Sequence, residues 1–167
     1  MTETTIYLAL GSNVGDSAAN IQQAIELMRS KITDISEAPI YSSKAVGYTD
    51  QPDFLNTAVR GQTELQPLEL LKFVKNIEQQ VGRIQRFRWG PREIDIDIIF
   101  YGDQVIEMPS LTIPHPRFAE RDFVLRPISD LSPHRIDPTS GKTVSELLEK
   151  LPASSLAIYG TKPSKNP

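Results

Sequence analysis

Two amphipathic helix patterns, each framed by strand-like runs, constrain the fold of this 167-residue chain more than any other feature. In the first, which Asp16 or Ser17 can cap, apolar residues stand at positions 21, 24, 25 and 28, the spacing of one helix face. The second starts at Pro67, carries apolar residues at 70, 74, 77 and 81, and reaches Gly82, a typical helix stop. Both segments are therefore predicted to be helices that pack one side against a sheet.

Four runs rich in β-branched and aromatic residues are predicted to be strands, at residues 5–10, 35–43, 54–63 and 94–101. With the two helices they give the order β-α-β-β-α-β, which is that of ferredoxin-like domains. We therefore expect an α+β fold with a ferredoxin-like βαββαβ core and an antiparallel sheet. Gly102 and Asp103 are expected to turn the last strand into a short hairpin with a partner at residues 105–106.

The last third of the chain is rich in proline and reads as irregular, and residues 143–151 form the only clear further helix pattern there. The core is thus expected to be extended by a hairpin and by C-terminal helical structure. A length of 167 residues suits a single domain. We expect that domain to cover residues 1–160, and residues 161–167 to be a flexible tail.

The composition is that of an ordinary soluble protein, with 39% hydrophobic and 23% charged residues. The net charge of −3 argues against a general nucleic-acid binder, for which a basic domain is typical. Without cysteine the chain has no disulfide and no thiolate metal site. The N-terminal apolar run is too short for a signal peptide or a membrane span, so the expected location is the cytoplasm, with no membrane partner.

The last predicted strand carries two aspartates, Asp95 and Asp97, although aspartate is disfavoured in strands. Residues two apart point to the same face and lie roughly 6.5–7 Å from each other, so their carboxylates can converge on hard cations. On its own, this pattern is more typical of a polar strand face that is open to solvent. However, residues 83–92 contain no acid and four arginines: Arg83, Arg86, Arg88 and Arg92. Arginines bind phosphate oxygens, so the combination favours a nucleotide-phosphate site with magnesium.

These residues also match a known family. RWGPREIDIDII (88–99) resembles the signature of 6-hydroxymethyl-7,8-dihydropterin pyrophosphokinases, and four further segments resemble that family in the same order: LALGSN (8–13), DQPDFLN (50–56), IEQQVGR (77–83) and PHPRFAERDFVL (114–125). The resemblance covers nearly the whole chain to about residue 150. It implies transfer of pyrophosphate from ATP to the hydroxymethyl group of the dihydropterin, with release of AMP, in folate biosynthesis.

The resemblance assigns the charged residues to ATP and to two Mg²⁺ ions. Asp95 and Asp97 match the metal ligands, and Arg83 and Arg92 match arginines that clamp phosphate and stabilise transferred charge. The segment 83–91 is the expected lid over the substrates. The further residues implied to contact ATP are Arg88, Trp89, Ile98 through its backbone, Thr112, His115 and Arg121. On sequence alone His115 is equally plausible as a turn residue, whereas an anchoring aromatic is the less favoured alternative for Trp89.

For the pterin, the resemblance implies an aromatic sandwich. Phe54 and Phe123 would stack on the two faces of the ring, and Asn56 would bind its polar edge. Backbone groups at Ser43 and Val46 would complete this recognition, with residues 48–51 as a second moving loop. Without the motif context, each phenylalanine is more typical of the core.

Some positions depart from the family or carry no assigned role. Lys75 and Pro116 stand where some members have residues near adenine, which leaves the adenine contacts open. Glu78 is interpreted as an acid on the helix surface.

Two rival functions remain: another magnesium-dependent phosphotransferase or phosphohydrolase, and a non-catalytic binding module. A monomer that binds ATP and the dihydropterin is the expected form.

Overall fold

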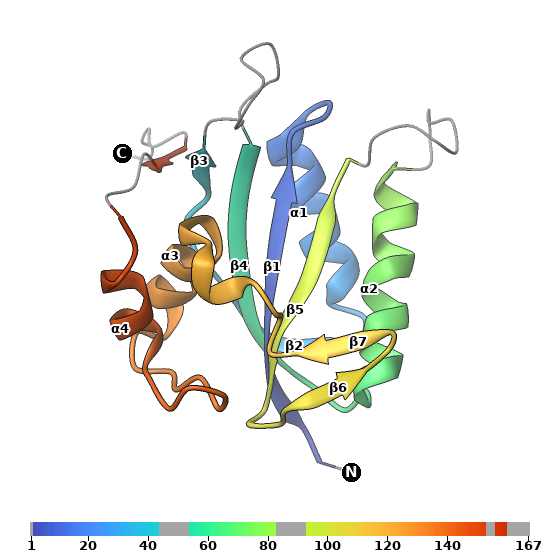
Figure 1. The fold of residues 1–167 in the computed structure, drawn as a ribbon. Helices are drawn as coiled ribbons and strands as arrows, with labels where there is room; N and C mark the ends of the chain where they lie inside the picture. Colours follow the sequence, from blue (N-terminus) through green and yellow to red (C-terminus); the bar gives the residue numbers. More distant parts are fainter. Residues whose placement is uncertain (1, 44–53, 83–92, 153–155, 160–167) are drawn as a thin grey trace.

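The computed structural model describes residues 2–43, 54–82, 93–152 and 156–159 (Figure 1). No helix within these ranges is long and apolar enough to cross a membrane. In chain order the elements are β1 (Thr4–Ser12), α1 (Ser17–Met28), β2 (Ile32–Glu37), β3 (Tyr41–Ser43), β4 (Phe54–Thr63), α2 (Pro67–Gly82), β5 (Asp95–Tyr101), β6 (Ile106–Met108), β7 (Leu111–Ile113), a 3₁₀ turn (Phe118–Glu120), α3 (Asp122–Leu131), α4 (Val144–Glu149) and β8 (Ala157–Ile158).

The main sheet has six strands, in the order β5-β1-β4-β3-β8, with β2 also paired to β4. Every pairing in it is antiparallel. The second strand of the core, which follows α1, is divided into β2 and β3. Across the sheet, the core strands therefore stand in the order fourth, first, third, second. This arrangement confirms the predicted ferredoxin-like core. The strands β1 and β4 lie in the middle of the sheet, while β5 lies at one edge.

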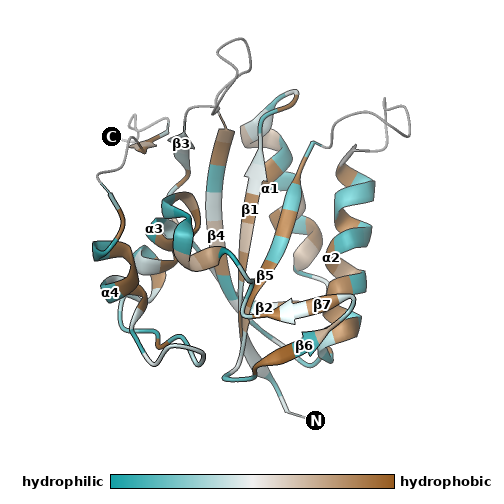
Figure 2. Cartoon of the chain, in the orientation of Figure 1, coloured by the Kyte–Doolittle hydropathy of each residue, from teal (hydrophilic) through white to brown (hydrophobic). Residues whose placement is uncertain are grey.

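One face of the sheet is covered by α1 and α2 (Figure 1). The side chain of Asp16 caps α1 by accepting a hydrogen bond from the Ala19 N–H at 3.1 Å, as predicted. α2 carries both hydrophobic and hydrophilic residues along its length (Figure 2), and its predicted apolar stripe is buried. The core on this face is almost wholly aliphatic: Leu8, Leu10, Ile21, Ile25, Leu70, Val74, Ile77, Ile96 and Ile98.

The other face is covered only in part, by α3 and α4. Phe100 lies at the centre of this smaller core and makes edge-to-face contacts with Tyr7 and Phe118, with ring centroids 5.7 and 5.2 Å apart. The aromatic contacts lie near the start of β1 and the end of β5. Towards the opposite ends of these two strands the same face opens into a cavity.

Two strand predictions were wrong. The run 35–43 is not one strand, because β2 ends at Glu37 and β3 begins at Tyr41. Pro39 lies in the interruption and has no N–H to continue the ladder. The expected hairpin between β5 and residues 105–106 does not form either, since β6 pairs with β7 in a separate two-stranded sheet.

The C-terminal region is more helical than predicted. α4 lies within the predicted 143–151 and starts with a capping box between Thr143 and Glu146. α3 was missed, because Pro127 lies inside it and proline is disfavoured in helix interiors. The expected tail, 161–167, lies outside the described residues and stays a prediction, as does the single domain 1–160.

Candidate functional site

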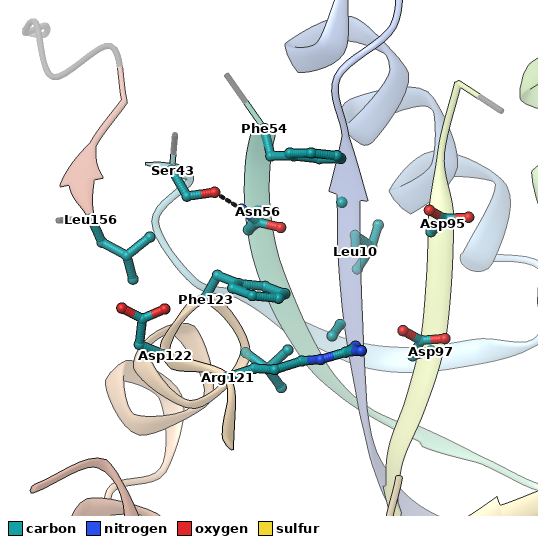
Figure 3. Close-up of a pocket in the computed structure, with 13 residues that line it drawn as sticks. Leu10, Ser43, Phe54, Asn56, Asp95, Asp97, Arg121, Asp122, Phe123 and Leu156 are labelled. Carbon is teal, nitrogen blue, oxygen red and sulfur yellow. Dashed lines mark hydrogen bonds between the residues drawn. The ribbon is translucent and has the colours of Figure 1, made fainter. Parts of the chain in front are cut away.

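The uncovered part of the sheet forms a cavity of about 460 Å³ (Figure 3). Five elements contribute to its wall: β1, β3, β4, β5 and the first turn of α3. The lining residues are Ala9, Leu10, Gly11, Ser43, Phe54, Asn56, Asp95, Asp97, Arg121, Asp122, Phe123, Val124 and Leu156. The cavity therefore brings together residues from opposite ends of the chain.

Asp95 and Asp97 stand on the cavity face of β5, as the strand alternation predicted. Ile96, between them, is 1% exposed and packs in the aliphatic core on the opposite face. In the neighbouring strand, Gly11 pairs with Asp95 and Ala9 pairs with Asp97. These small residues leave space beside both carboxylates, which Figure 3 shows one above the other along the strand.

Asn56 lies in the floor of the cavity and is 6% exposed. Its amide donates a hydrogen bond to the Ser43 hydroxyl at 3.1 Å, which joins two predicted pterin residues and orients the side chain. A Cβ atom at Gly11, its partner on β1, would lie only 3.0 Å from Asn56 Oδ1. Glycine at position 11 therefore makes room for the amide.

Phe54 and Phe123 lie on either side of Asn56 in Figure 3. Phe54 is the first residue of β4, and Phe123 belongs to the first turn of α3. Both are half-buried and line the cavity, so neither is a fully packed core residue. Aromatic walls with a polar group between them suit a flat ring that carries hydrogen-bonding atoms on its edge.

Arg121 and His115 approach Asp97 from the segment that leads into α3. Arg121 lines the cavity, and its guanidinium carbon lies 5.7 Å from the Phe123 ring centroid. His115 Nε2 lies 4.0 Å from Asp97 Oδ2, and its Nδ1 accepts a hydrogen bond from the Arg117 N–H. Burial lowers the pKa of His115, and this outweighs the opposite influence of the Asp97 carboxylate. A neutral ring that accepts at Nδ1 carries its proton on Nε2, directed at the site.

The remaining predicted residues are less directly placed. Ile98 is buried beside Asp97 in β5, and Thr112 is exposed on β7; neither lines the cavity. The predictions for Val46, Arg83, Arg88, Trp89, Arg92 and the loop 48–51 fall outside the described residues, as does Arg86.

Several contributors to this region were not predicted. Asp122 and Leu156 line the cavity, and nothing in the sequence around Leu156 indicates that it returns to this face. The interpretation of Glu78 as a surface acid was wrong, because Glu78 is 5% exposed. Its carboxylate accepts a hydrogen bond from the Ile96 N–H at 2.7 Å.

The donor set at the cavity suits magnesium. Among the residues that the structure describes, no three histidine, cysteine or acidic side chains are grouped as an all-protein metal site. Asp95 and Asp97 supply two carboxylates beside open space. Magnesium is commonly held by one or two carboxylates together with substrate phosphates, so this pair fits the ion.

Taken together, a ferredoxin-like sheet, a carboxylate pair and an aromatic-walled cavity define an enzyme-like site for a flat heterocycle. The family model for 7,8-dihydro-6-hydroxymethylpterin-pyrophosphokinase (HPPK) matches residues 7–133. The pyrophosphokinase of Aquifex aeolicus is 44% identical over 142 residues, which cover 85% of this chain and 89% of that protein. The Bacillus subtilis pyrophosphokinase is 43% identical, with coverage of 75% and 76%.

Longer proteins contain a similar region. The mitochondrial folate synthesis bifunctional protein of Pisum sativum is 47% identical over 133 residues, and the chain spans 26% of its length. The crystal structure of Plasmodium falciparum HPPK-DHPS with pterin and p-hydroxybenzoate matches with a TM-score of 0.72 at 17% identity, over 90% of this chain and 42% of that one. At that identity, the structural match supports the fold alone.

The chain belongs to the HPPK family. As a member it is a transferase of folate biosynthesis, which passes a pyrophosphoryl group from ATP to 6-hydroxymethyl-7,8-dihydropterin.

Proposed function

We propose that this chain carries out its pyrophosphoryl transfer with two magnesium ions held by Asp95 and Asp97, beside a pterin stacked between Phe54 and Phe123. The observation that carries the proposal is their convergence: one cavity is lined by both carboxylates, both aromatic rings and Asn56. A hydrolase of simple phosphates has no use for the aromatic walls.

The two carboxylates hold the metal ions beside the phosphates of ATP. Magnesium, when bound, neutralises the triphosphate and favours ionisation of the attacking hydroxyl. Asp95 and Asp97 supply its protein oxygens, while Gly11 and Ala9 leave the space that the phosphates need. Because two carboxylates at this spacing do not complete two coordination spheres, substrate oxygens and water supply the rest.

The phenylalanines and Asn56 hold the acceptor. Stacking fixes the plane of the pterin, and the Asn56 amide fixes its rotation within that plane. The hydrogen bond from Asn56 to Ser43 keeps the amide oriented before the ligand arrives, which reduces the entropy cost of binding. This positioning brings the hydroxymethyl group towards the carboxylate side of the cavity.

The basic groups act on ATP. Arg121 and the Nε2–H of a neutral His115 stand beside Asp97, where they bind phosphate oxygens. Arg83, Arg88, Trp89 and Arg92, with the Ile98 backbone and Thr112, are assigned to ATP by the motif alone. Backbone groups at Ser43 and Val46 are assigned to the pterin in the same way. Catalysis arises from positioning and charge stabilisation, without a covalent intermediate.

The proposal is tested by AMP formation from ATP, with and without the dihydropterin, in magnesium and in EDTA. Asp97→Asn keeps the size of the side chain and removes its charge, so turnover should fall by about 100-fold or more, because metal-ion charge stabilisation contributes several kcal/mol. Asp103→Asn is the matched control, since Asp103 is 92% exposed on the turn after β5. It should remain fully active.

The rival functions give different results. AMP or ADP that forms at the same rate without pterin would indicate a hydrolase, and folded protein without turnover would indicate a binding module. Full activity of Asp97→Asn would contradict the metal assignment. The monomeric state and the cytoplasmic location stay predictions.

A further inference from the structure

The proposed metal ligands stand on an edge strand. β5 is the terminal strand of the sheet, and in the described part of the chain no strand pairs with its outer side. Edge strands lack half of their ladder hydrogen bonds and are more readily displaced than central ones. Metal ligands, by contrast, must be held to within a fraction of an ångström. Something other than a neighbouring strand must therefore hold the outer side of β5.

Within the described ranges, hydrogen bonds reach that side of β5 at both of its ends. Near the end of β5, the Ile99 carbonyl accepts a hydrogen bond from the His115 N–H at 3.4 Å. At the aspartate end, the Ile96 N–H donates to Glu78 Oε2 at 2.7 Å. The second contact falls on the peptide group between Asp95 and Asp97. It therefore acts on the segment of backbone that sets the separation and direction of the two carboxylates.

Glu78 is itself held firmly. It lies near the end of α2, one residue after Ile77, which is 1% exposed in the aliphatic core. Lys75 Nζ lies 3.3 Å from Glu78 Oε2 and offsets part of the cost of burying the carboxylate. A buried charged acceptor makes a shorter and stronger bond to an amide than a neutral one does. The helix thus provides a rigid point of attachment for the edge strand.

We propose that Glu78 is a positioning residue for the aspartate pair, which it aligns by binding the Ile96 amide between them. This inference rests on the proposed function, since it concerns the same metal ligands. Glu78 lies on the outer side of β5 and acts through the backbone of that strand, so it is not a catalytic residue. Groups that orient metal ligands typically contribute 10–100-fold to metal affinity or activity.

Three variants separate this role from a general effect on folding. Glu78→Leu removes the acceptor, because it replaces the carboxylate with an apolar side chain of similar volume. Glu78→Gln removes the charge and keeps an acceptor oxygen for the Ile96 amide. Val74→Ala, at a buried position on the same helix, destabilises the core without touching the hydrogen bond and is the matched control.

The first measurement is hydrogen exchange of the Ile96 amide in metal-free protein, relative to the Leu8 amide in the central strand β1. Glu78→Leu should raise this ratio by about tenfold, because it removes the partner of the Ile96 N–H. Glu78→Gln should raise it only slightly. Val74→Ala keeps the partner of the Ile96 N–H and should therefore not raise this ratio.

The second measurement is the magnesium concentration that gives half-maximal turnover. It should rise by about 10–100-fold in Glu78→Leu, with much of kcat recovered at saturating magnesium and KM for the pterin unchanged. Glu78→Gln should stay within about threefold of wild type, and Val74→Ala should be unchanged.

Wild-type exchange and wild-type magnesium dependence in Glu78→Leu would overturn the inference. So would a Glu78→Gln variant as impaired as Glu78→Leu, since charge and not the hydrogen bond would then be responsible. If wild-type protein forms no AMP with pterin and magnesium, the proposed function fails. An active wild type with an unaffected Glu78→Leu variant refutes this inference alone.

Discussion

The two faces of the sheet are built from the same strands but are held in different ways. On the face of α1 and α2, neighbouring strands contribute aliphatic side chains that are almost fully buried. On the opposite face, α3 is also attached to the sheet by hydrogen bonds between side chains. Tyr7 and Arg60 both donate to the Ser132 hydroxyl, at 2.7 and 2.8 Å, and Tyr41 donates to Asp130.

This difference follows from what each face does. Because successive strand residues point to opposite sides, β5 buries Ile96 in the aliphatic core and presents Asp95 and Asp97 to the cavity. The aliphatic face stabilises the sheet and contributes no reactive group to the site. The other face must stay partly open, so its helices gain less from apolar burial and rely more on specific polar contacts.

The largest expected effect is on the aliphatic face. Leu8 is 0% exposed in the middle of β1, so Leu8→Ala should lower the free energy of unfolding by about 2–5 kcal/mol through lost burial and the cavity that remains. Because Leu8 points away from the site, kcat per folded molecule should change little. Denaturant unfolding and an assay under folding conditions measure the two quantities. A large loss of kcat in fully folded protein would mean that the two faces are not separable.

A smaller effect is expected where the cavity face depends on the absence of a side chain. Gly11→Ala would place a methyl group 3.0 Å from Asn56 Oδ1, so the amide must shift from its position beside Ser43. We expect KM for the pterin to rise about tenfold, the equivalent of roughly one hydrogen bond. The stability should hardly change. An unaltered pterin KM would remove Asn56 from the proposed recognition.

The sequence predicts the aliphatic face better than the cavity face. α1 and α2 follow from helical periodicity, since buried aliphatic residues recur at fixed spacing and Asp16 and Pro67 mark the starts. α3 lacks that regularity because Pro127 interrupts it. The pairing of β6 was also not predicted: it forms a local hairpin with β7, the next strand in the chain, and does not pair with β5.

The site residues divide in a similar way. Motif resemblance identified Phe54, Asn56, Asp95, Asp97, Arg121 and Phe123, and the fold brings all of them to one cavity. Glu78 was misread because an acid on an amphipathic helix normally faces solvent. Its burial results from the packing of α2 beside the edge of β5, which no local pattern encodes. Residues that act through the backbone of another element are therefore the hardest to predict.

The smallest expected effect concerns the hydrogen bonds that attach α3 to the sheet. Tyr41 is 4% exposed, and its hydroxyl donates to Asp130 and accepts from Arg126 Nε at 3.4 Å. Tyr41→Phe should lower the free energy of unfolding by about 1 kcal/mol at pH 7, because it removes this link. Tyr159→Phe, at an exposed tyrosine, is the control and should have no effect at that pH.

Wild type and Tyr41→Phe should also differ in how their stability depends on pH. Burial, and then the hydrogen bond to Asp130, raise the pKa of Tyr41 above its ordinary value of 10.0. Above that value the unfolded chain loses the Tyr41 proton while the folded chain keeps it, so unfolding becomes easier as the pH rises towards the folded pKa. The stability advantage of wild type over Tyr41→Phe should therefore be constant below pH 10.0 and decline above it, as followed by urea unfolding at a series of pH values. An advantage that grows above this pH would mean that the folded protein favours the ionised tyrosine, and that the bond to Asp130 does not hold α3 to the sheet.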